Sequence, residues 1–236
     1  MVAIRRIRLP QRGHVNTSIS NAEHGVPGAS WPSGLDDGGD PPREFSDVGG
    51  TAVYAGVMGL APVAGRACGL VVLCVLAWQI AARGLDFFRA GSFLRFIHGV
   101  DLMIHEAGHT FFLVFGQFLH VLGGSLLEVA VPALCAVHFF RQRQPASLAV
   151  ALFWTGESIT DVAIYMADAR TMALPLVGGG HHDWNYLLGT LGLLGAAGLL
   201  GTLTYGLGVL IILGALAVLT MDLVVAWNRA VAGRQE

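Results

Sequence analysis

The sequence carries little charge and no lysine. Only 13% of its 236 residues are charged and 54% are hydrophobic, whereas a typical soluble domain is about one-quarter charged. The side chains with a permanent positive charge are all arginines, 14 of them against 16 acidic residues. This composition argues against a protein surrounded by water alone. The lack of a basic stripe argues against nucleic acid as a partner.

Cysteine is also scarce. Cys68, Cys74 and Cys135 all lie in apolar runs and form no C-x-x-C pair, so the sequence predicts neither a disulfide framework nor a thiolate zinc site. Any metal bound by this chain must therefore use nitrogen and oxygen ligands.

Residues 1–50 lack a long apolar run and are rich in Gly, Pro, Ser, Asp and Arg. This bias predicts a disordered N-terminal segment, or one that a start codon assigned too far upstream has added. A cleaved signal peptide is not indicated, because no apolar segment follows the first arginines. Residues 51–236 form the second part of the chain, a predicted transmembrane domain.

From Thr51 onward the chain is mostly apolar and divides into blocks of about 20 residues, the length that crosses a hydrocarbon core. The predicted fold class is therefore all-α, a polytopic transmembrane helical bundle of five or six spans. Gly201, Gly206 and Gly208 are available for a turn between the last two spans. The predicted spans are 62–82, 96–116, 121–140, 146–166, 186–205 and 208–227.

Arginines between the predicted spans indicate the orientation, because positively charged short loops stay on the cytoplasmic side. Arg83, Arg89 and Arg95 lie between the first two spans, and Arg141 and Arg143 lie between the third and fourth. Both loops are therefore expected inside. The side of the C-terminus depends on whether there are five spans or six.

The second predicted span contains the motif His105-Glu106-Ala107-Gly108-His109. Residues four apart on a helix share a face, so two imidazoles can bind one zinc ion while the adjacent Glu reaches a water on that ion. The motif predicts His105 and His109 as ligands of Zn²⁺ and Glu106 as the general base.

Two other predicted helices bring acidic residues to the depth of the histidines. At about 1.5 Å per residue, His105 and His109 lie roughly 15 and 21 Å from the inner edge, and Glu157 and Asp161 lie roughly 18 and 24 Å from it. Glu128 falls near the same level on the third span. Charged residues inside a membrane span are costly and usually mark function, so we expect these groups to converge.

A catalytic zinc site normally has three protein ligands, so one ligand must come from outside the motif. Asp161 is preferred, because its depth suits His109. The alternatives are Asp168 and the polar cluster at 181–184, since a loop there can fold back over the site. Ligand alternatives, or residues that support a ligand, are Asp101, Glu128, Glu157, Asp168, His182 and Asp183.

The motif within an apolar helix, the following Gly116 and Gly123-Gly124, and Pro132 in the next helix resemble the site-2-protease-like intramembrane zinc metalloproteases, in particular their small bacterial branch. The resemblance covers about residues 95–170. It implies zinc bound by His105, His109 and a later aspartate, here Asp161, with Glu106 catalytic. In place of the family's Asn-Pro-Asp-Gly or Leu-Asp-Gly sequence this chain has Glu157-Ser-Ile-Thr-Asp161.

Three functions are consistent with these residues. The first is an intramembrane zinc metallopeptidase that hydrolyses a membrane-embedded or membrane-adjacent peptide, in the bacterial inner (cytoplasmic) membrane and in contact with its lipid. The second is a zinc hydrolase of a lipid amide or ester, which the same chemistry suits. The third is a metal or proton transporter, in which the intramembrane His and acidic residues form a relay.

Overall fold

A computed structural model describes residues 48–89, 91–176 and 182–235, with side chains from Leu60 onward. All regular secondary structure in these ranges is helical, which confirms the predicted all-α class. The disorder predicted for residues 1–50 falls largely outside the described residues. The described chain begins with a helix that starts at Val48.

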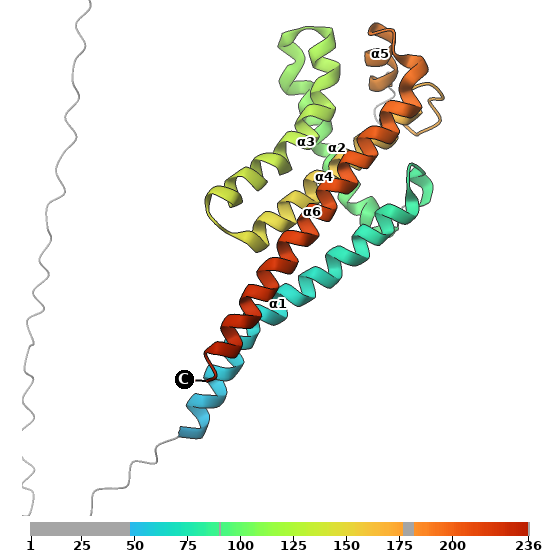
Figure 1. The fold of residues 1–236 in the computed structure, drawn as a ribbon. Helices are drawn as coiled ribbons and strands as arrows, with labels where there is room; N and C mark the ends of the chain where they lie inside the picture. Colours follow the sequence, from blue (N-terminus) through green and yellow to red (C-terminus); the bar gives the residue numbers. More distant parts are fainter. Residues whose placement is uncertain (1–47, 90, 177–181, 236) are drawn as a thin grey trace, which may run out of the picture. The chain divides into compact units, whose positions relative to one another are not determined.

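Six α-helices and three short 3₁₀ turns make up the described chain (Figure 1). In chain order they are α1 (Val48–Arg83), η1 (Phe87–Arg89), α2 (Ser92–Phe112), η2 (Leu113–Phe115), α3 (Gln117–Arg141), α4 (Pro145–Asp168), α5 (Asp183–Thr190), η4 (Leu194–Ala196) and α6 (Ala197–Ala232).

Four of the described helices are long and apolar enough to cross a membrane, so the predicted count of five or six is not confirmed. The segment predicted at 96–116 does form a helix, α2, but three charged residues and three histidines make it too polar to qualify. The four candidate spans are Leu60–Arg83, Gln117–Arg141, Pro145–Asp168 and Leu194–Ala232.

The two spans predicted at 186–205 and 208–227 are wrong as separate helices, because α6 runs unbroken from Ala197 to Ala232. The glycines expected to make a turn serve close packing instead. A Cβ on Gly208 would lie 2.7 Å from the carbonyl oxygen of Gly156 on α4, and one on Gly201 would lie 2.8 Å from that of Ala163. Small residues let membrane helices approach this closely.

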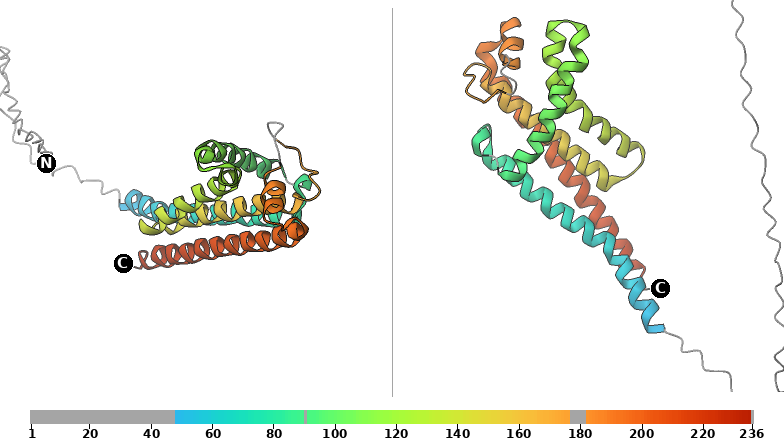
Figure 2. Two further views of the ribbon diagram at one scale, coloured as in Figure 1. Left: turned by 90° about the horizontal axis from the view of Figure 1, so that it is seen from above. Right: turned by 180° about the vertical axis from the view of Figure 1, so that it is seen from behind.

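Helix α4 is the most enclosed candidate span. Within the described chain, 72% of its apolar window is buried, against 17% in α1 and in the last span. In both orientations α4 runs beside α6 (Figure 2). Large apolar side chains on the outer helices, such as Trp78 and Leu210, stay exposed, as expected where lipid is the solvent. An apolar core joins α1, the start of α2, α4 and α6: Leu73, Leu76, Ile80, Leu94, Ala149, Phe153, Ile212, Ala215 and Leu219.

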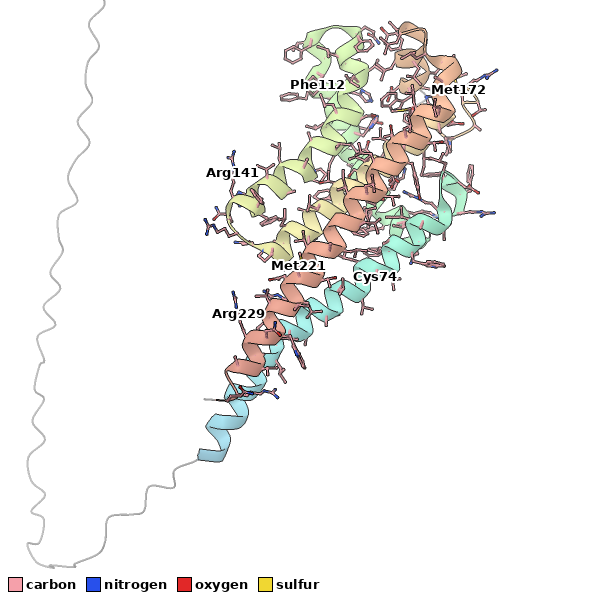
Figure 3. All side chains as sticks on the ribbon, in the orientation of Figure 1. Cys74, Phe112, Arg141, Met172, Met221 and Arg229 are labelled. Carbon is pink, nitrogen blue, oxygen red and sulfur yellow. The ribbon has the colours of Figure 1, made fainter. Side chains whose placement is uncertain are left out.

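Local sequence explains where α3 and α4 begin. Gly116 has a φ of +91° at the turn before α3, a backbone conformation that residues other than glycine rarely adopt. Pro145 occupies the start of α4, where its missing N–H costs no helical hydrogen bond. Arg141 lies at the turn between the two helices, and Arg229 lies near the end of α6 (Figure 3).

Replacing Gly208 with alanine is expected to destabilise the protein, because the new methyl group would collide with the backbone of Gly156 and with Thr160. Overpacking of this kind costs roughly 1–3 kcal/mol. Gly206→Ala is the matched control, since no atom lies within 4 Å of its added Cβ. Thermal unfolding in detergent should show a lower midpoint for Gly208→Ala only. Equal midpoints would contradict the tight α4–α6 contact.

Candidate metal centre

The two histidines of the motif lie on one face of α2, with ring centroids 4.8 Å apart. Helix α3 passes directly beside them. A Cβ on Gly124 would lie 2.5 Å from Nε2 of His105 and 2.7 Å from Nε2 of His109. Glycine at this position therefore leaves the space that both imidazoles occupy.

The Nδ1 atoms of both histidines are held by groups on α3. Nδ1 of His105 lies 2.9 Å from Oε2 of Glu128, and Nδ1 of His109 lies 2.9 Å from the carbonyl oxygen of His120. Because a carbonyl oxygen only accepts, Nδ1 of His109 donates; a carboxylate at Glu128 imposes the same tautomer on His105. In the neutral imidazoles the Nε2 atoms are then left with lone pairs.

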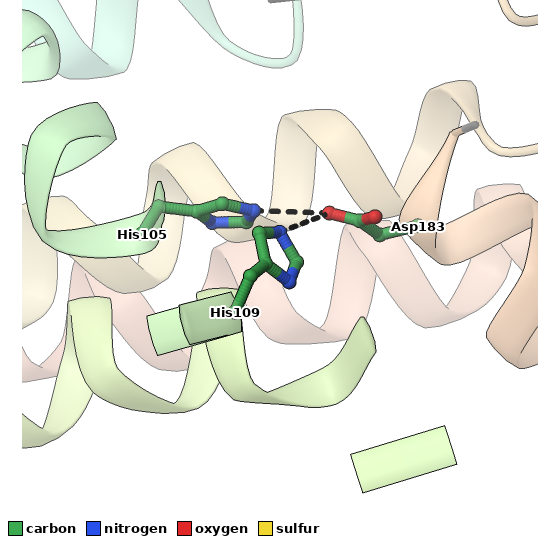
Figure 4. Close-up of side chains that lie close together, drawn as sticks. All are labelled: His105, His109 and Asp183. Atoms are coloured by element: carbon green, nitrogen blue, oxygen red, sulfur yellow. Dashed lines mark hydrogen bonds and ion pairs between the residues drawn. The ribbon is translucent and has the colours of Figure 1, made fainter. Parts of the chain in front are cut away.

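A single carboxylate oxygen faces both Nε2 atoms (Figure 4). Oδ2 of Asp183 lies 3.0 Å from Nε2 of His105 and 3.2 Å from Nε2 of His109. His105 and Asp183 are largely buried, and the side chain of His109 is 17% exposed. Two nitrogen atoms and one oxygen atom thus converge from α2 and α5.

Several polar contacts hold the first turn of α5 over the histidines. Nδ1 of His182 accepts from the backbone N–H of Asn185 as an N-cap, and Nδ2 of Asn185 donates to the carbonyl oxygen of Ala169 at the end of α4. Nε1 of Trp184 donates to Oγ of Ser125 on α3, and the backbone N–H of Asp183 donates to the hydroxyl of Tyr165. These bonds fix the chain around the Asp183 carboxylate.

Electrostatic interaction with the two histidines favours the negatively charged form of Asp183. Burial by itself would raise the pKa of Asp183. When Nε2 of both histidines carries a proton, hydrogen bonds from His105 and His109, together with their positive charge, lower this pKa to about 2. Burial lowers the pKa of the neighbouring His182, whose ring stacks on Tyr165 with centroids 4.1 Å apart. The carboxylate is therefore ionised at neutral pH, opposite two imidazoles that balance its charge when they are protonated.

The donor set suits zinc. His105, His109 and Asp183 offer ligand atoms that all lie within 4.8 Å of one another. In a tetrahedral site with zinc–ligand distances of about 2.0–2.2 Å, neighbouring ligand atoms lie about 3.3–3.6 Å apart, close to the separations of 3.0 and 3.2 Å found here. Calcium and magnesium prefer oxygen ligands throughout, so two imidazoles favour zinc over either of them. Three protein ligands also leave a fourth position for a water molecule.

A cavity of about 470 Å³ opens onto these ligands. Glu106 lines it together with the three candidate ligands, and its own side chain is exposed. Apolar side chains such as Leu102 and Val162 form part of the wall, and Leu174–Leu176, which has no regular secondary structure, forms another part. Glu106, the three candidate ligands and an apolar wall therefore share one space.

The structure places Asp161, the preferred third ligand, in a different cluster. Its Oδ1 lies 2.6 Å from Nη2 of Arg83, and its Oδ2 lies 3.0 Å from Nδ1 of His98. Asp101 and Glu157 lie beside it rather than beside the motif histidines. The predicted convergence in depth holds for Glu128, which reaches His105 from α3.

Asp168 has a structural role at the end of α4. It accepts hydrogen bonds from the hydroxyl of Thr171 and from the backbone N–H groups of Ala173 and Leu174, and it lies 3.4 Å from Nε2 of His182. It thus fixes the turn at 171–174 that follows α4, and it is not brought next to His105 or His109.

Sequence reasoning gave Asp183 only as an alternative and did not identify the backbone of His120 as a partner of His109. The bond between these two residues is reciprocal, since Nδ1 of His120 also donates to the carbonyl oxygen of His109, at 2.8 Å. Eleven residues and a turn separate them, so no helical spacing signals this contact. The run of His and Asp at 182–183 was the available signal for Asp183.

Comparison with protein-family models, with curated proteins and with solved structures found no match for this chain.

Removing Arg83 is expected to destabilise the protein strongly, because Arg83→Met leaves Asp161 charged in a site where both side chains are at most 3% exposed. Breaking a buried ion pair in this way costs roughly 3–5 kcal/mol. Unfolding in denaturant, followed by circular dichroism, gives the measurement.

Arg66→Met is the matched control, since the Arg66–Asp222 pair also links α1 to another helix but Arg66 is 28% exposed. It should cost clearly less. Adding Asp161→Asn to Arg83→Met should recover part of the loss. A double variant no more stable than Arg83→Met alone would refute the proposed charge penalty.

Proposed function

We propose that this protein is a zinc-dependent hydrolase of the membrane, with His105, His109 and Asp183 as the zinc ligands and Glu106 as the general base. One observation carries the proposal. Both imidazoles direct Nε2 at the same oxygen of Asp183 while α3 holds each Nδ1. Zinc-bound histidines commonly make this kind of second contact, to a carboxylate or to a backbone carbonyl.

The chemistry follows from the cavity. Zinc with three protein ligands lowers the pKa of a water molecule to about 7 and polarises a carbonyl group. Glu106 lines the same cavity, so its carboxylate can accept a proton from water and later pass it to the leaving group. Glu128 and the carbonyl oxygen of His120 hold the imidazoles in place during these steps.

We infer a peptide as the substrate. Leu174–Leu176 supports this, because a non-helical segment along a cavity wall offers backbone groups with which an extended peptide can pair. The resemblance of His105–His109 and the glycines of α3 to intramembrane metalloproteases supports the same substrate class, and with it a bacterial cytoplasmic membrane. Asp183 then takes the place that the resemblance assigns to Asp161.

A metal or proton transporter is the second candidate. It is supported by the buried carboxylates of Asp101, Glu157 and Asp161, which a hydrolase with the proposed ligand set does not use. The two functions differ in what Glu106 does, and this difference provides a test.

The zinc content of the purified protein tests the ligand set. Wild type should contain about one zinc per chain. His105→Ala and Asp183→Asn should lose it, because each removes one of three ligands, whereas Glu106→Gln should retain it. Atomic emission or absorption on detergent-purified, size-selected protein gives the measurement.

Asp161→Asn is the matched control for Asp183→Asn, since both replace one carboxylate oxygen by an NH₂ group in a largely buried aspartate. Zinc retained in Asp161→Asn and lost in Asp183→Asn supports the assignment. The reverse pattern would return the third ligand to Asp161. A folded wild type that binds no zinc, even after zinc is added, would refute the hydrolase and leave a hydrogen-bonded His–Asp cluster.

Glu106→Gln is also expected to lower the rate of hydrolysis at least about 100-fold, because general acid–base catalysis accelerates a reaction by about that factor or more. Cleavage of a library of apolar peptides in proteoliposomes gives the rate, and lipid amides and esters in the same vesicles test the other acyl substrates. Zinc or proton flux across wild-type vesicles that continues without peptide and is unchanged in Glu106→Gln would favour the transporter instead.

A further inference from the structure

A second cluster of acidic side chains lies between α2 and α4, apart from the candidate zinc ligands. One carboxylate oxygen each from Asp101, Glu157 and Asp161 lie within 4.8 Å of one another. Asp101 and Glu157 are 0% exposed and Asp161 is 6% exposed. Ionised carboxylates are acceptors only, so three of them at this distance repel one another unless something positive lies between them.

Glu157 is the unusual member, because neither of its carboxylate oxygens has a hydrogen-bond partner among the described residues. The other two acids have hydrogen-bond partners. Asp161 is bonded to Arg83 and His98, and Asp101 accepts from Nε1 of Trp154 at 2.7 Å and from Oγ of Ser158 at 3.4 Å. A fully buried carboxylate without any partner is strongly disfavoured.

The charges do not balance within the cluster. Three ionised carboxylates carry three negative charges, and Arg83 supplies one positive charge. A protonated His98 supplies one more. One negative charge then remains, and two of the three carboxylates, those of Asp101 and Glu157, are closed to water. A single additional positive charge makes the cluster neutral.

We propose that the Asp101–Glu157–Asp161 cluster is a proton-binding site, with the proton on Glu157, and that this proton exchanges through the cavity. The proton neutralises the one carboxylate that lacks a partner and gives it a hydrogen to donate to a neighbouring acid. This inference is independent of zinc and of hydrolysis.

A proton fits this site better than a metal ion does. Metal ions that prefer carboxylates take six or more oxygen ligands, several of them often from water. Both oxygens of Asp161 and both oxygens of Asp101 are already engaged by protein donors, and Glu157 is closed to solvent. Only the two oxygens of Glu157 have no protein donor, and two oxygens are fewer than such an ion requires.

The route to the cavity runs through Asp161 and His98, which both line it. The other titratable groups that act on the cluster come from the helices packed around it. Glu128 on α3 interacts electrostatically with His98 and Asp161. Tyr205 on α6 interacts electrostatically with Arg83 and Asp161. Tyr205 itself donates to the carbonyl oxygen of Ile80, so Glu157 remains the group without a partner.

Infrared spectroscopy of the purified protein at neutral pH tests the proposal, because a protonated carboxyl group has a carbonyl band that an ionised carboxylate lacks. Glu157→Gln should remove one such band from the spectrum. The variant should fold, since an amide has the shape and neutrality of the protonated acid, and an unchanged thermal unfolding midpoint would confirm this.

Asp222→Asn is the matched control and should leave the band in place, because Asp222 is paired with Arg66. Asp101→Asn should also remove the band, since one negative charge fewer leaves the cluster neutral without the proton. Transfer to D₂O should shift the band in the folded wild type.

A carbonyl band that survives both Glu157→Gln and Asp101→Asn would overturn the proposal. So would a metal ion other than zinc that co-purifies with wild type and is lost in Glu157→Gln. A band that does not shift in D₂O would overturn the exchange through the cavity.

Discussion

The arrangement of this protein depends on neutralising carboxylates that are buried among apolar helices. An unpaired charge in such surroundings costs several kcal/mol, and Asp101, Glu128, Glu157 and Asp161 are all buried. Side chains from other helices pair with these carboxylates. Arg83 at the end of α1 binds Asp161, and His105 on α2 binds Glu128. These contacts fix how the polar faces of α1, α2, α3 and α4 meet.

Close approach of the helices makes this matching possible. Gly123 and Gly124 bring the backbone of α3 against α2, so that the carbonyl oxygen of His120 and the carboxylate of Glu128 can both reach imidazole nitrogens. Gly156 and Gly208 do the same for α4 and α6. In lipid, where apolar side chains gain little by leaving the solvent, such packing and the hydrogen bonds that it permits hold helices together.

The parts of the fold and site that could be read from the sequence are those set by local spacing. The four-residue step from His105 to His109 fixes one helix face, and counting residues along a span predicted that Glu128 would reach their level. Asp183 could not be ranked first, because its position depends on how the chain after Asp168 folds back. That path is set by the Asn185, Trp184 and Tyr165 contacts, which have no periodic pattern.

Dependence on contacts between helices also explains why two spans were predicted at 186–205 and 208–227, where α6 is a single helix. Glycines in an apolar run are compatible with a turn and with a tight helix contact, and the choice depends on whether a neighbouring helix presents small residues at matching heights. Helix α4 does so at Gly156, Ala163 and Ala167. The apolar stretch from Tyr186 to Trp227 is about twice the roughly 20 residues that cross a hydrocarbon core of about 30 Å, so length alone suggested two crossings.

The cavity joins the two polar clusters, and this bears on how water and protons reach a reaction inside a membrane. Its wall includes His105, His109 and Asp183 at one place, and His98 and Asp161 at another. A hydrolase here needs water that the surrounding apolar helices exclude, and a lining of charged and imidazole groups lowers the cost of keeping water in such a space. Of the three acids that a transporter could use for protons, Asp161 is the one that also lines this cavity. Because Asp161 belongs to the acidic cluster and also lines the cavity, the two clusters are parts of one polar system.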